Sequence, residues 1–377
     1  MDRRRLPVIA IDIGAGFGVK LGLFEGRTSQ IDESSVGRNE FQEDYDRFVE
    51  RLLDAMERLL RANDRRMRDM LAIGIASPGL FRSDGTYYLT SNLEFLIGKN
   101  LREDLAKETG LPTAIENDAN AGGLAEWSAM RTDLLYWVFG GGWGGAWISR
   151  EGAVKHAAVD WDGDDATLHP TNEPGYAIGL EKWQLRTLFY EFKTSYSRFE
   201  EIVLEDMGLS GGELTGPSGN PETIRAEVIL SGPGRCRLFR ALVGNNDFYK
   251  RFLAIDEFDA MGNTAIAGEY ISKLSNMRVE AAINTDRLFG RVLADAAFTM
   301  LQEARKDGLR EGVPICLGGK PSYALPYFGP SAQRHLGAFG IFSYLQPSII
   351  DLRGLNANLV GAAVLAEKAF VKSERCV

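Results

Sequence analysis

The chain has 377 residues, a formal net charge of −9 and 45% apolar residues, which is typical of a soluble globular protein with two domains or one large one. No basic block offsets the negative charge, which argues against nucleic acid as the main partner, and no apolar run is long enough to cross a membrane. Cys236, Cys316 and Cys376 lie too far apart for a disulfide framework or a metal-binding motif, so a reducing, cytoplasmic setting is expected.

A glycine-rich turn between two apolar runs is the first informative motif. Asp12–Gly18 reads Asp-Ile-Gly-Ala-Gly-Phe-Gly and follows the apolar run Pro7–Ile11. A β-hairpin of this kind brings backbone N–H groups close to a phosphate, because Gly14 and Gly16 carry no Cβ that would block the approach. Asp12 at the strand end can hold a metal ion that bridges phosphates. A plain hairpin turn is the alternative interpretation.

Helices and strands are expected to alternate through the first third of the chain. Apolar residues recur at helical spacing in 41–62, and 71–76 is typical of a strand that ends in the turn Ser77–Gly79. A short strand at 113–116 and a helix at 120–127 follow. This alternation predicts an α/β layer.

Polar residues follow the predicted strands. Asn92 lies in Ser-Asn-Leu, and Asn117 and Asp118 lie in the block Glu-Asn-Asp-Ala-Asn, between a strand and a helix. A carboxylate there can accept a proton from a sugar hydroxyl while that oxygen attacks a γ-phosphate, and an amide can bind vicinal hydroxyls. The alternative is that Asn117 and Asp118 merely cap the helix that follows.

A second glycine cluster repeats the pattern of strand, glycines and strand. Leu134–Phe139 is typical of a buried strand, Gly140–Gly145 contains five glycines, and Ala146–Ser149 begins another strand. Two phosphate-binding hairpins of this kind would resemble the arrangement in the actin-like ATPase and sugar-kinase superfamily. Two unrelated tight turns are the alternative.

The middle of the chain is less informative. Residues 150–180 are expected to be irregular, and their acidic run, 160–165, is interpreted as a solvated loop that could contribute a metal ligand. Residues 183–280 are expected to be mostly helical, and the aromatic side chains between 188 and 199 are interpreted as core or subunit interface.

The last third returns to long elements. Thr285 is expected to cap a helix that ends near Lys306. A strand at 313–317 ends in Gly318 and Gly319, and a final helix is expected to begin near Asn358.

Together these motifs resemble the ROK family (repressors, open reading frames, kinases) of sugar kinases. The family pattern of Glu-Asn-Asp-Ala-Asn and a short helix that ends in Ala-Glu-Trp matches Glu116–Trp127 almost residue by residue. Pro78-Gly79, Asn92-Leu93 and the glycine motifs match less specifically, as does Gly361-Ala-Ala363 in the closing helix. The resemblance covers most of the chain except about 150–170 and 186–280.

The resemblance implies an α/β, two-domain actin-like ATPase fold (ribonuclease H-like) with a central ligand cleft. Residues 1–130 plus 357–377 would form the first domain, and residues 131–356 the second, with a helical insertion at about 186–280. The sequence does not decide whether this insertion forms the contact of a homodimer.

The resemblance also implies roles for single residues in ATP-dependent phosphorylation of a hexose or amino sugar. Asp118 would be the catalytic base, and Asp12 would lie near Mg²⁺, through water. The residues implied to bind the sugar are Asn92, Asn117, Gly79, Glu173 and Glu181. The residues implied to bind Mg-ATP are Asp12, Gly14, Gly16, Gly141, Gly142, Gly144, Gly318 and Gly319.

The chain departs from the family in three respects. The family's first phosphate loop contains a Thr and a Lys, whereas this chain has Ala15, Gly16 and Phe17 at that place. The family's zinc motif begins Glu-x-Gly-His, and its counterpart here, Glu173-Pro-Gly-Tyr176, lacks the His, while the family's cysteine cluster is also missing. Since a zinc site needs about four ligands, no zinc is expected.

Two other functions remain open at this point. A sugar-binding or regulatory protein that has lost turnover fits the altered first loop. A filament-forming actin-like ATPase fits the Asp-x-Gly-x-Gly spacing, although the Glu-Asn-Asp-Ala-Asn block speaks against it.

Overall fold

The chain divides into two units in the computed structural model, and each is described separately. Unit 1 comprises residues 1–136, 146–161 and 349–377, and unit 2 comprises residues 137–145 and 162–348. The domain bounds predicted from the sequence stay a prediction. The residues that the structure describes are 7–14, 18–41, 43–90, 92–155, 159–162, 165–209, 212–244 and 255–374.

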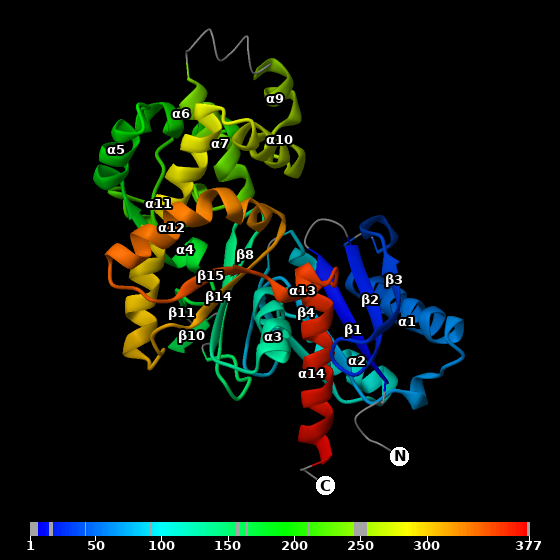
Figure 1. Cartoon of the computed structure of the whole chain (residues 1–377). Coiled ribbons are helices and arrows are strands. Elements are labelled where there is room, and N and C mark those ends of the chain that lie inside the picture. The colour runs from blue at the N-terminus through cyan, green and yellow to red at the C-terminus, as the bar shows by residue number, and fades with distance from the viewer. Residues whose placement is uncertain are drawn as a thin grey trace. The chain divides into compact units, whose positions relative to one another are not determined.

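A five-stranded sheet in the order β3-β2-β1-β4-β7 forms the centre of unit 1 (Figure 1). The hairpin predicted at the first glycine motif is confirmed, because β1 and β2 pair antiparallel with Gly14 opposite Gly18. In contrast, β1, β4 and β7 run parallel, so their carboxyl ends meet at one edge of the sheet. The strands are β1 (Pro7–Gly14), β2 (Gly18–Glu25), β3 (Gln30–Val36), β4 (Ile73–Ser77) and β7 (Thr113–Asn117).

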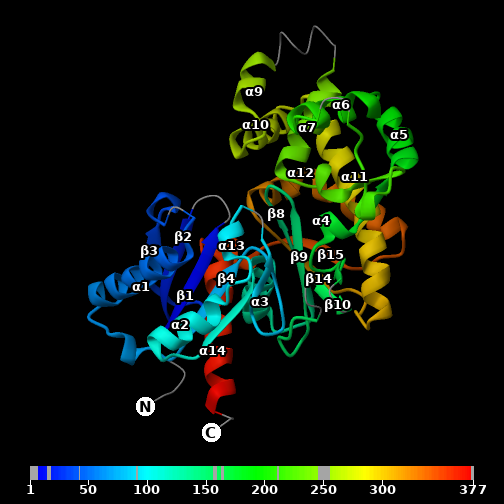
Figure 2. The ribbon, with the colours of Figure 1, turned by 180° about the vertical axis from the view of Figure 1, so that it is seen from behind.

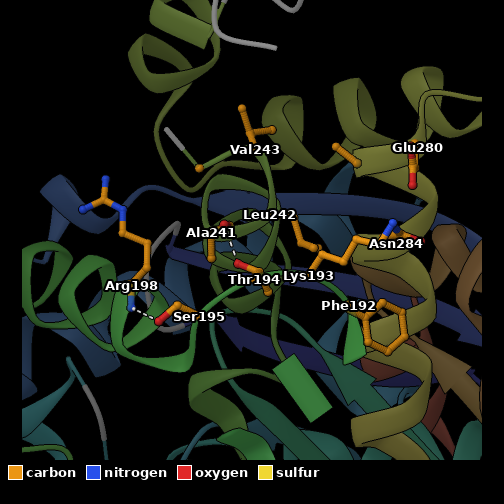
Figure 3. A pocket seen from close by; sticks show the side chains of 12 residues that line it. Phe192, Lys193, Thr194, Ser195, Arg198, Ala241, Leu242, Val243, Glu280 and Asn284 are labelled. Carbon is orange, nitrogen blue, oxygen red and sulfur yellow. Dashed lines mark hydrogen bonds between the residues drawn. The ribbon is translucent and has the colours of Figure 1, made fainter. Parts of the chain in front are cut away.

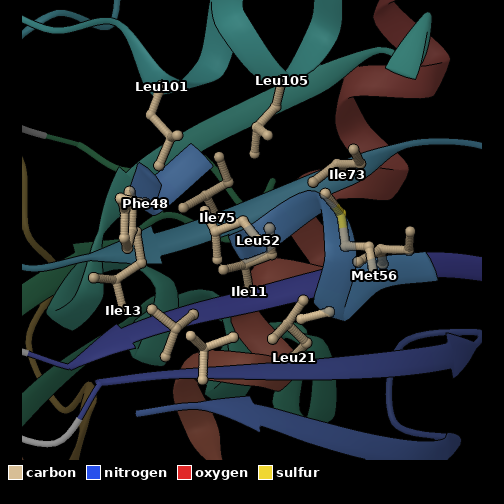
Figure 4. Packing of buried hydrophobic residues seen from close by; sticks show 14 of the residues in the cluster. Ile11, Ile13, Leu21, Phe48, Leu52, Met56, Ile73, Ile75, Leu101 and Leu105 are labelled. Carbon is tan, nitrogen blue, oxygen red and sulfur yellow. The ribbon is translucent and has the colours of Figure 1, made fainter. Parts of the chain in front are cut away.

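One face of this sheet is covered by α1 (Tyr45–Ala62) and α2 (Leu101–Thr109), which carry the helical periodicity seen in the sequence. Figure 4 shows side chains of the sheet packed against those of the two helices. α3 (Asp118–Met130) and α14 (Ala357–Glu374) contact each other, and α14 also lies against β1, β4 and β7. The buried residues labelled in Figure 4 are Ile11, Ile13, Leu21, Phe48, Leu52, Met56, Ile73, Ile75, Leu101 and Leu105.

The second sheet has the order β15-β14-β8-β9. The predicted pattern of strand, glycines and strand is confirmed by β8 and β9, each of which is divided between the units. The strands are β8 (Leu134–Phe139), β9 (Trp143–Ile148), β14 (Pro314–Gly318) and β15 (Tyr344–Pro347). Short two-stranded ladders are formed by β5 (Leu80–Phe81) with β6 (Tyr87–Leu89), β10 (Val159–Asp162) with β11 (Asp165–Leu168), and β12 (Gly179–Glu181) with β13 (Thr223–Arg225).

Helices make up most of unit 2, and α7 contacts α6, α10 and α11 (Figure 2). They are α4 (Pro174–Ala177), α5 (Lys182–Glu191), α6 (Tyr196–Asp206), α7 (Gly232–Val243), α9 (Ile255–Met261), α10 (Ala265–Asn276), α11 (Glu280–Lys306) and α12 (Leu325–Ala338). The 3-10 turns η6 (Ala226–Val228) and η7 (Lys320–Ala324) precede α7 and α12, and α13 (Ile349–Leu352) opens the last segment of unit 1. None of the described helices is both long and apolar enough to span a membrane.

Two local predictions were wrong. The helix expected to begin at Thr285 begins at Glu280, because the Thr285 hydroxyl donates to the carbonyl of Ala281 inside the helix, at 2.8 Å, and does not cap it. The segment 150–180 was expected to be irregular but contains β10, β11 and α4, although residues 163–164 of the acidic run lie outside the described part of the chain.

Candidate functional site

The carboxyl-end edge of the parallel strands in unit 1 carries the polar block found in the sequence. Asp12 of β1 lies opposite Ala76 of β4, and Ser77 lies opposite Asn117 of β7. Asp118 follows directly as the first residue of α3. The parallel register thus brings residues from three separate segments of the chain to one edge.

Asn117 forms the cap that the alternative interpretation predicted. Its Oδ1 accepts from the backbone N–H groups of Ala119, at 2.9 Å, and Asn120, at 3.3 Å. Its Nδ2 donates to the carbonyl of Gly79, at 3.1 Å, which ties the start of α3 to the turn after β4. One amide N–H therefore remains for a ligand, and the predicted role of Asn117 in sugar binding stays a prediction.

Asp118 is a carboxylate with a raised proton affinity. Its Oδ1 accepts from the backbone N–H of Ala119 at 2.9 Å, which fixes the side chain at the N-terminus of the helix. Burial raises the pKa of Asp118 to about 6, and the negative charge of Asp12 adds to the shift. A base with this pKa is deprotonated at neutral pH yet binds a proton more readily than an ordinary aspartate.

Asp12 is held by two amides at the start of α14. Its two carboxylate oxygens accept from Asn358, at 3.0 Å, and Asn356, at 2.9 Å. Burial nevertheless raises the pKa of Asp12. Because the charge of Asp12 raises the pKa of Asp118, a cation near these carboxylates would relieve repulsion, and their oxygen donors fit Mg²⁺.

Among the residues that the structure describes, no three His, Cys, Asp or Glu side chains group closely enough to hold a metal ion. A magnesium ion near Asp12 would therefore take the rest of its ligands from phosphate oxygens and water, which is the usual arrangement at phosphate-binding sites. The predicted absence of zinc stays a prediction.

The turn after β4 and the loop before α2 hold the other predicted residues of unit 1. Gly79 presents its carbonyl to Asn117. Asn92 is exposed, and its backbone carbonyl accepts from the Arg38 guanidinium at 2.7 Å. Gly14 ends β1, whereas Gly16 lies outside the described residues.

A cavity of about 660 Å³ in unit 2 brings together two glycine motifs. Its lining includes Gly140 and Gly141 of the second glycine cluster and Gly319 after β14. α10 supplies further lining residues, and Tyr323 and Tyr327 add aromatic surface. A cavity of this size with a mostly apolar wall and a few polar groups is typical of a small-molecule site.

Gly319 is required by the close approach of these two turns. Its φ is +80°, and a Cβ there would collide with the carbonyl oxygen of Phe139. Of the other predicted glycines in unit 2, Gly318 is buried at the end of β14, and Gly144 lies within β9. Neither of these two is among the residues that line the cavity.

Gly142 faces Glu227, a residue that the sequence did not mark. A Cβ at Gly142 would lie 2.6 Å from Oε2 of Glu227, and one at Gly175 would lie 2.9 Å from Cβ of Glu227. Burial raises the pKa of Glu227, and its carboxylate has no hydrogen bond or ion pair with any described residue. No local motif surrounds Glu227 in the sequence, so only the fold reveals this position.

The two predicted carboxylates of this region lie on either side of the turn at 174–179. Glu173 precedes α4, next to Gly175, so it lies close in the chain to the position that Glu227 contacts. Glu181 lies in β12, where it pairs with Thr223 of β13. Their predicted roles in sugar binding stay predictions.

A second cavity of about 530 Å³ lies between the ends of α6, α7 and α11 (Figure 3). Thr194 donates to the carbonyl of Ala241 at 2.7 Å, and Lys193 and Arg198 also line the cavity. None of the predicted sugar- or nucleotide-binding residues lines this cavity, so the cavity in Figure 3 is separate from the predicted site.

Residues 8–155 match the model of the ROK family. The chain is 28% identical over 159 residues to the xylose repressor of Caldicellulosiruptor bescii, which covers 39% of each chain. It is 35% identical over 103 residues to the N-acetyl-D-glucosamine kinase of Vibrio parahaemolyticus, which covers 26% of this chain and 34% of the relative. The chain spans less than half the length of the curated relatives it matches.

The fold is shared over nearly the whole length. The structure of a ROK-family glucokinase from Streptomyces griseus, in complex with glucose and AMPPNP, has a TM-score of 0.63 at 17% identity and covers 96% of this chain and 99% of its own. Residues 8–155 are thus similar in sequence to the ROK family, and the chain has the fold of the ROK-family kinases whose structures it resembles.

Proposed function

We propose that the protein phosphorylates a hydroxyl of a hexose or amino sugar with Mg-ATP. The observation that carries this proposal is Asp118, a carboxylate fixed at the N-terminus of α3 with a pKa of about 6. Kinases are among the curated relatives, including the N-acetyl-D-glucosamine kinase, which supports sugar as the substrate class.

In the proposed mechanism, Asp118 accepts the proton of the sugar hydroxyl as its oxygen attacks the γ-phosphate. Asp12 would hold Mg²⁺ through water, and when bound the ion would neutralise charge on the phosphates. The cavity lined by Gly140, Gly141 and Gly319 would bind the nucleotide, with backbone N–H groups directed at its phosphates. Orientation of the hydroxyl supplies much of the rate enhancement, because little covalent chemistry is left to the protein.

The value of kcat/KM for the sugar is expected to rise with pH and to reach half its maximum near pH 6. Asp118 acts as a base only when deprotonated, and burial together with Asp12 raises its pKa to about 6. Initial rates across the acid range check this, and Asp12→Asn should move the acid limb to lower pH because it removes a negative charge. An acid limb near pH 4, the ordinary range of an aspartate, would contradict the assignment.

Glu227→Gln is expected to raise the KM for the sugar about tenfold with a smaller change in kcat. Its buried carboxylate beside Gly142 fits an acceptor for a sugar hydroxyl, and hydrogen bonds to charged groups are worth about 1.5–3 kcal/mol. Glu181→Gln is the comparison variant, because the resemblance implies the sugar-binding role for Glu181. A larger increase in KM from Glu181→Gln than from Glu227→Gln would assign the binding of the sugar hydroxyl to Glu181.

The proposal is tested with purified protein, Mg-ATP and a panel of hexoses, N-acetylhexosamines and polyols, in which phosphoryl transfer is measured. Thermal shift on the same panel reports binding without turnover, because a ligand that binds only the folded state raises the melting temperature. Transfer to one or more sugars supports the kinase.

The second candidate is a sugar-binding regulatory protein. The xylose repressor among the relatives favours it, as does the first phosphate loop without Thr or Lys. This candidate predicts a thermal shift with a sugar, no shift with ATP and no phosphoryl transfer. The filament-forming ATPase predicts ATP-dependent light scattering instead, and a fixed small oligomer in ATP would exclude it.

A further inference from the structure

We infer that Lys320 and Lys273 bind the phosphates of a nucleoside polyphosphate in the 660 Å³ cavity. This inference rests on the proposed function, because it assigns the donor site of the same reaction. It adds two residues that neither the glycine motifs nor the polar block contains.

The position of Lys320 follows from the contact between two turns. Lys320 begins η7 directly after Gly319, whose Cα is pressed against the carbonyl of Phe139. The next residue, Gly140, accepts a hydrogen bond from the N–H of Gly232 at 2.9 Å, which fixes the other wall. Lys320 therefore lies where the second glycine cluster enters the cavity.

Lys273 approaches the same cavity from α10. It lies between other lining residues of that helix, Glu269 and Asn276, one turn away on either side. α10 also contacts η7, the turn that begins with Lys320. The two lysines thus come from neighbouring elements of unit 2 and line one cavity.

The other charged groups of the cavity leave the two lysine side chains able to bind a phosphate. Lys320 and Lys273 are exposed, and neither side-chain ammonium group has a hydrogen bond or ion pair with any residue that the structure describes. Arg235 also lines the cavity, but its guanidinium binds Asp286 at 2.7 Å, so its charge is already compensated. Glu269 is the carboxylate among the lining residues.

The chemistry of the wall favours a nucleoside over a bare anion. Tyr323 and Tyr327 offer aromatic surface to a base, while lysine ammonium groups bind phosphate as compact charges with three donors each. The negative charge of the phosphates needs cationic partners, and the two lysines supply them. The cavity therefore offers partners for both the base and the phosphates of a nucleotide.

The test is calorimetric titration of the full chain, in Mg²⁺ buffer, with adenosine, ADP, ATP and inorganic tripolyphosphate. The variants are Lys320→Met and Lys273→Met, and Lys107→Met on α2 of unit 1 is the control for loss of one exposed positive charge. Each cavity variant should lower the affinity for ATP and ADP about tenfold, while its affinity for adenosine should stay within about twofold of the wild-type value. The control should bind all four ligands like the wild type.

Other results would overturn the inference. Unchanged ATP affinity in a variant removes that lysine from the site, and an equal loss for adenosine and ATP means that the variant has disturbed the cavity itself. If tripolyphosphate bound as tightly as ATP, the ligand of the cavity would be a bare polyphosphate and not a nucleotide.

The same titrations separate this inference from the proposed function. A wild type that binds neither ATP nor ADP overturns both. Lysine-dependent ATP binding without transfer to any sugar overturns the kinase and leaves the phosphate site standing. ATP binding with transfer but with no lysine dependence leaves the kinase standing and overturns the phosphate site.

Discussion

Asp118→Asn is expected to lower kcat about 10³-fold while the KM for the sugar changes little, because a positioned general base contributes about 10²–10⁴-fold. The amide has the size of the carboxylate but cannot accept the proton of the hydroxyl. Steady-state kinetics with the sugar identified in the panel, together with thermal shift by the same sugar, provide the measurement.

The structure also provides the control for a merely structural effect of this substitution. Oδ1 of Asp118 accepts from the N–H of Ala119, and the Asn side chain keeps an oxygen that can do the same. Asn117→Ala removes the main cap of α3 instead and is expected to destabilise the protein by about 1 kcal/mol. A 10³-fold loss in Asp118→Asn without a matching loss of stability assigns the effect to the base, whereas near-normal turnover would remove Asp118 from the mechanism.

The polar edge of unit 1 could be predicted from the sequence because its key residues are contiguous. Asn117 and Asp118 lie side by side between a strand and a helix, and both the alternating elements and the strand that carries Asp12 have clear apolar runs. Hydrophobic periodicity and turn residues are local properties, so they predict local elements well. The same block carried the resemblance to the ROK family, whose model matches residues 8–155.

Residues that meet only through the fold were not predictable. Glu227 reaches Gly142 because the segment that carries it pairs with β12 through β13, and this pairing leaves no mark at either position. The cavity likewise takes its walls from four separate segments, among them η7 and α10. The start of α11 was misplaced because Thr285 can bond to a helix carbonyl as readily as it can cap.

Asp286→Ala is expected to lower the free energy of unfolding by about 3–5 kcal/mol, because it leaves the charge of Arg235 buried without its partner. Both side chains are almost fully buried, and Nε of Arg235 donates to Oδ1 of Asp286 at 2.8 Å. Ser275 donates to the other carboxylate oxygen at 2.6 Å. Urea unfolding of the variant and the wild type measures the difference.

The matched control is the surface pair of Arg198 and Glu201, at 3.2 Å, where Glu201→Ala should cost less than about 1 kcal/mol. Arg235→Met combined with Asp286→Leu should recover much of the loss, because it removes both charges at once. An Asp286→Ala variant no less stable than Glu201→Ala would show that the buried pair does not hold these helices together.

The same substitution connects stability to the proposed donor site. Arg235 also donates to the carbonyl of Gly268, at 2.8 Å, and to the hydroxyl of Ser272, at 3.2 Å, and all three residues line the cavity. Asp286, which does not line it, holds Arg235 in this position from α11. Asp286→Ala is therefore expected to lower the affinities for adenosine and for ATP to a similar degree. Lys320→Met should lower the affinity only for ligands that carry phosphates. The two variants thus separate the effect of the cavity's shape from the effect of its charge.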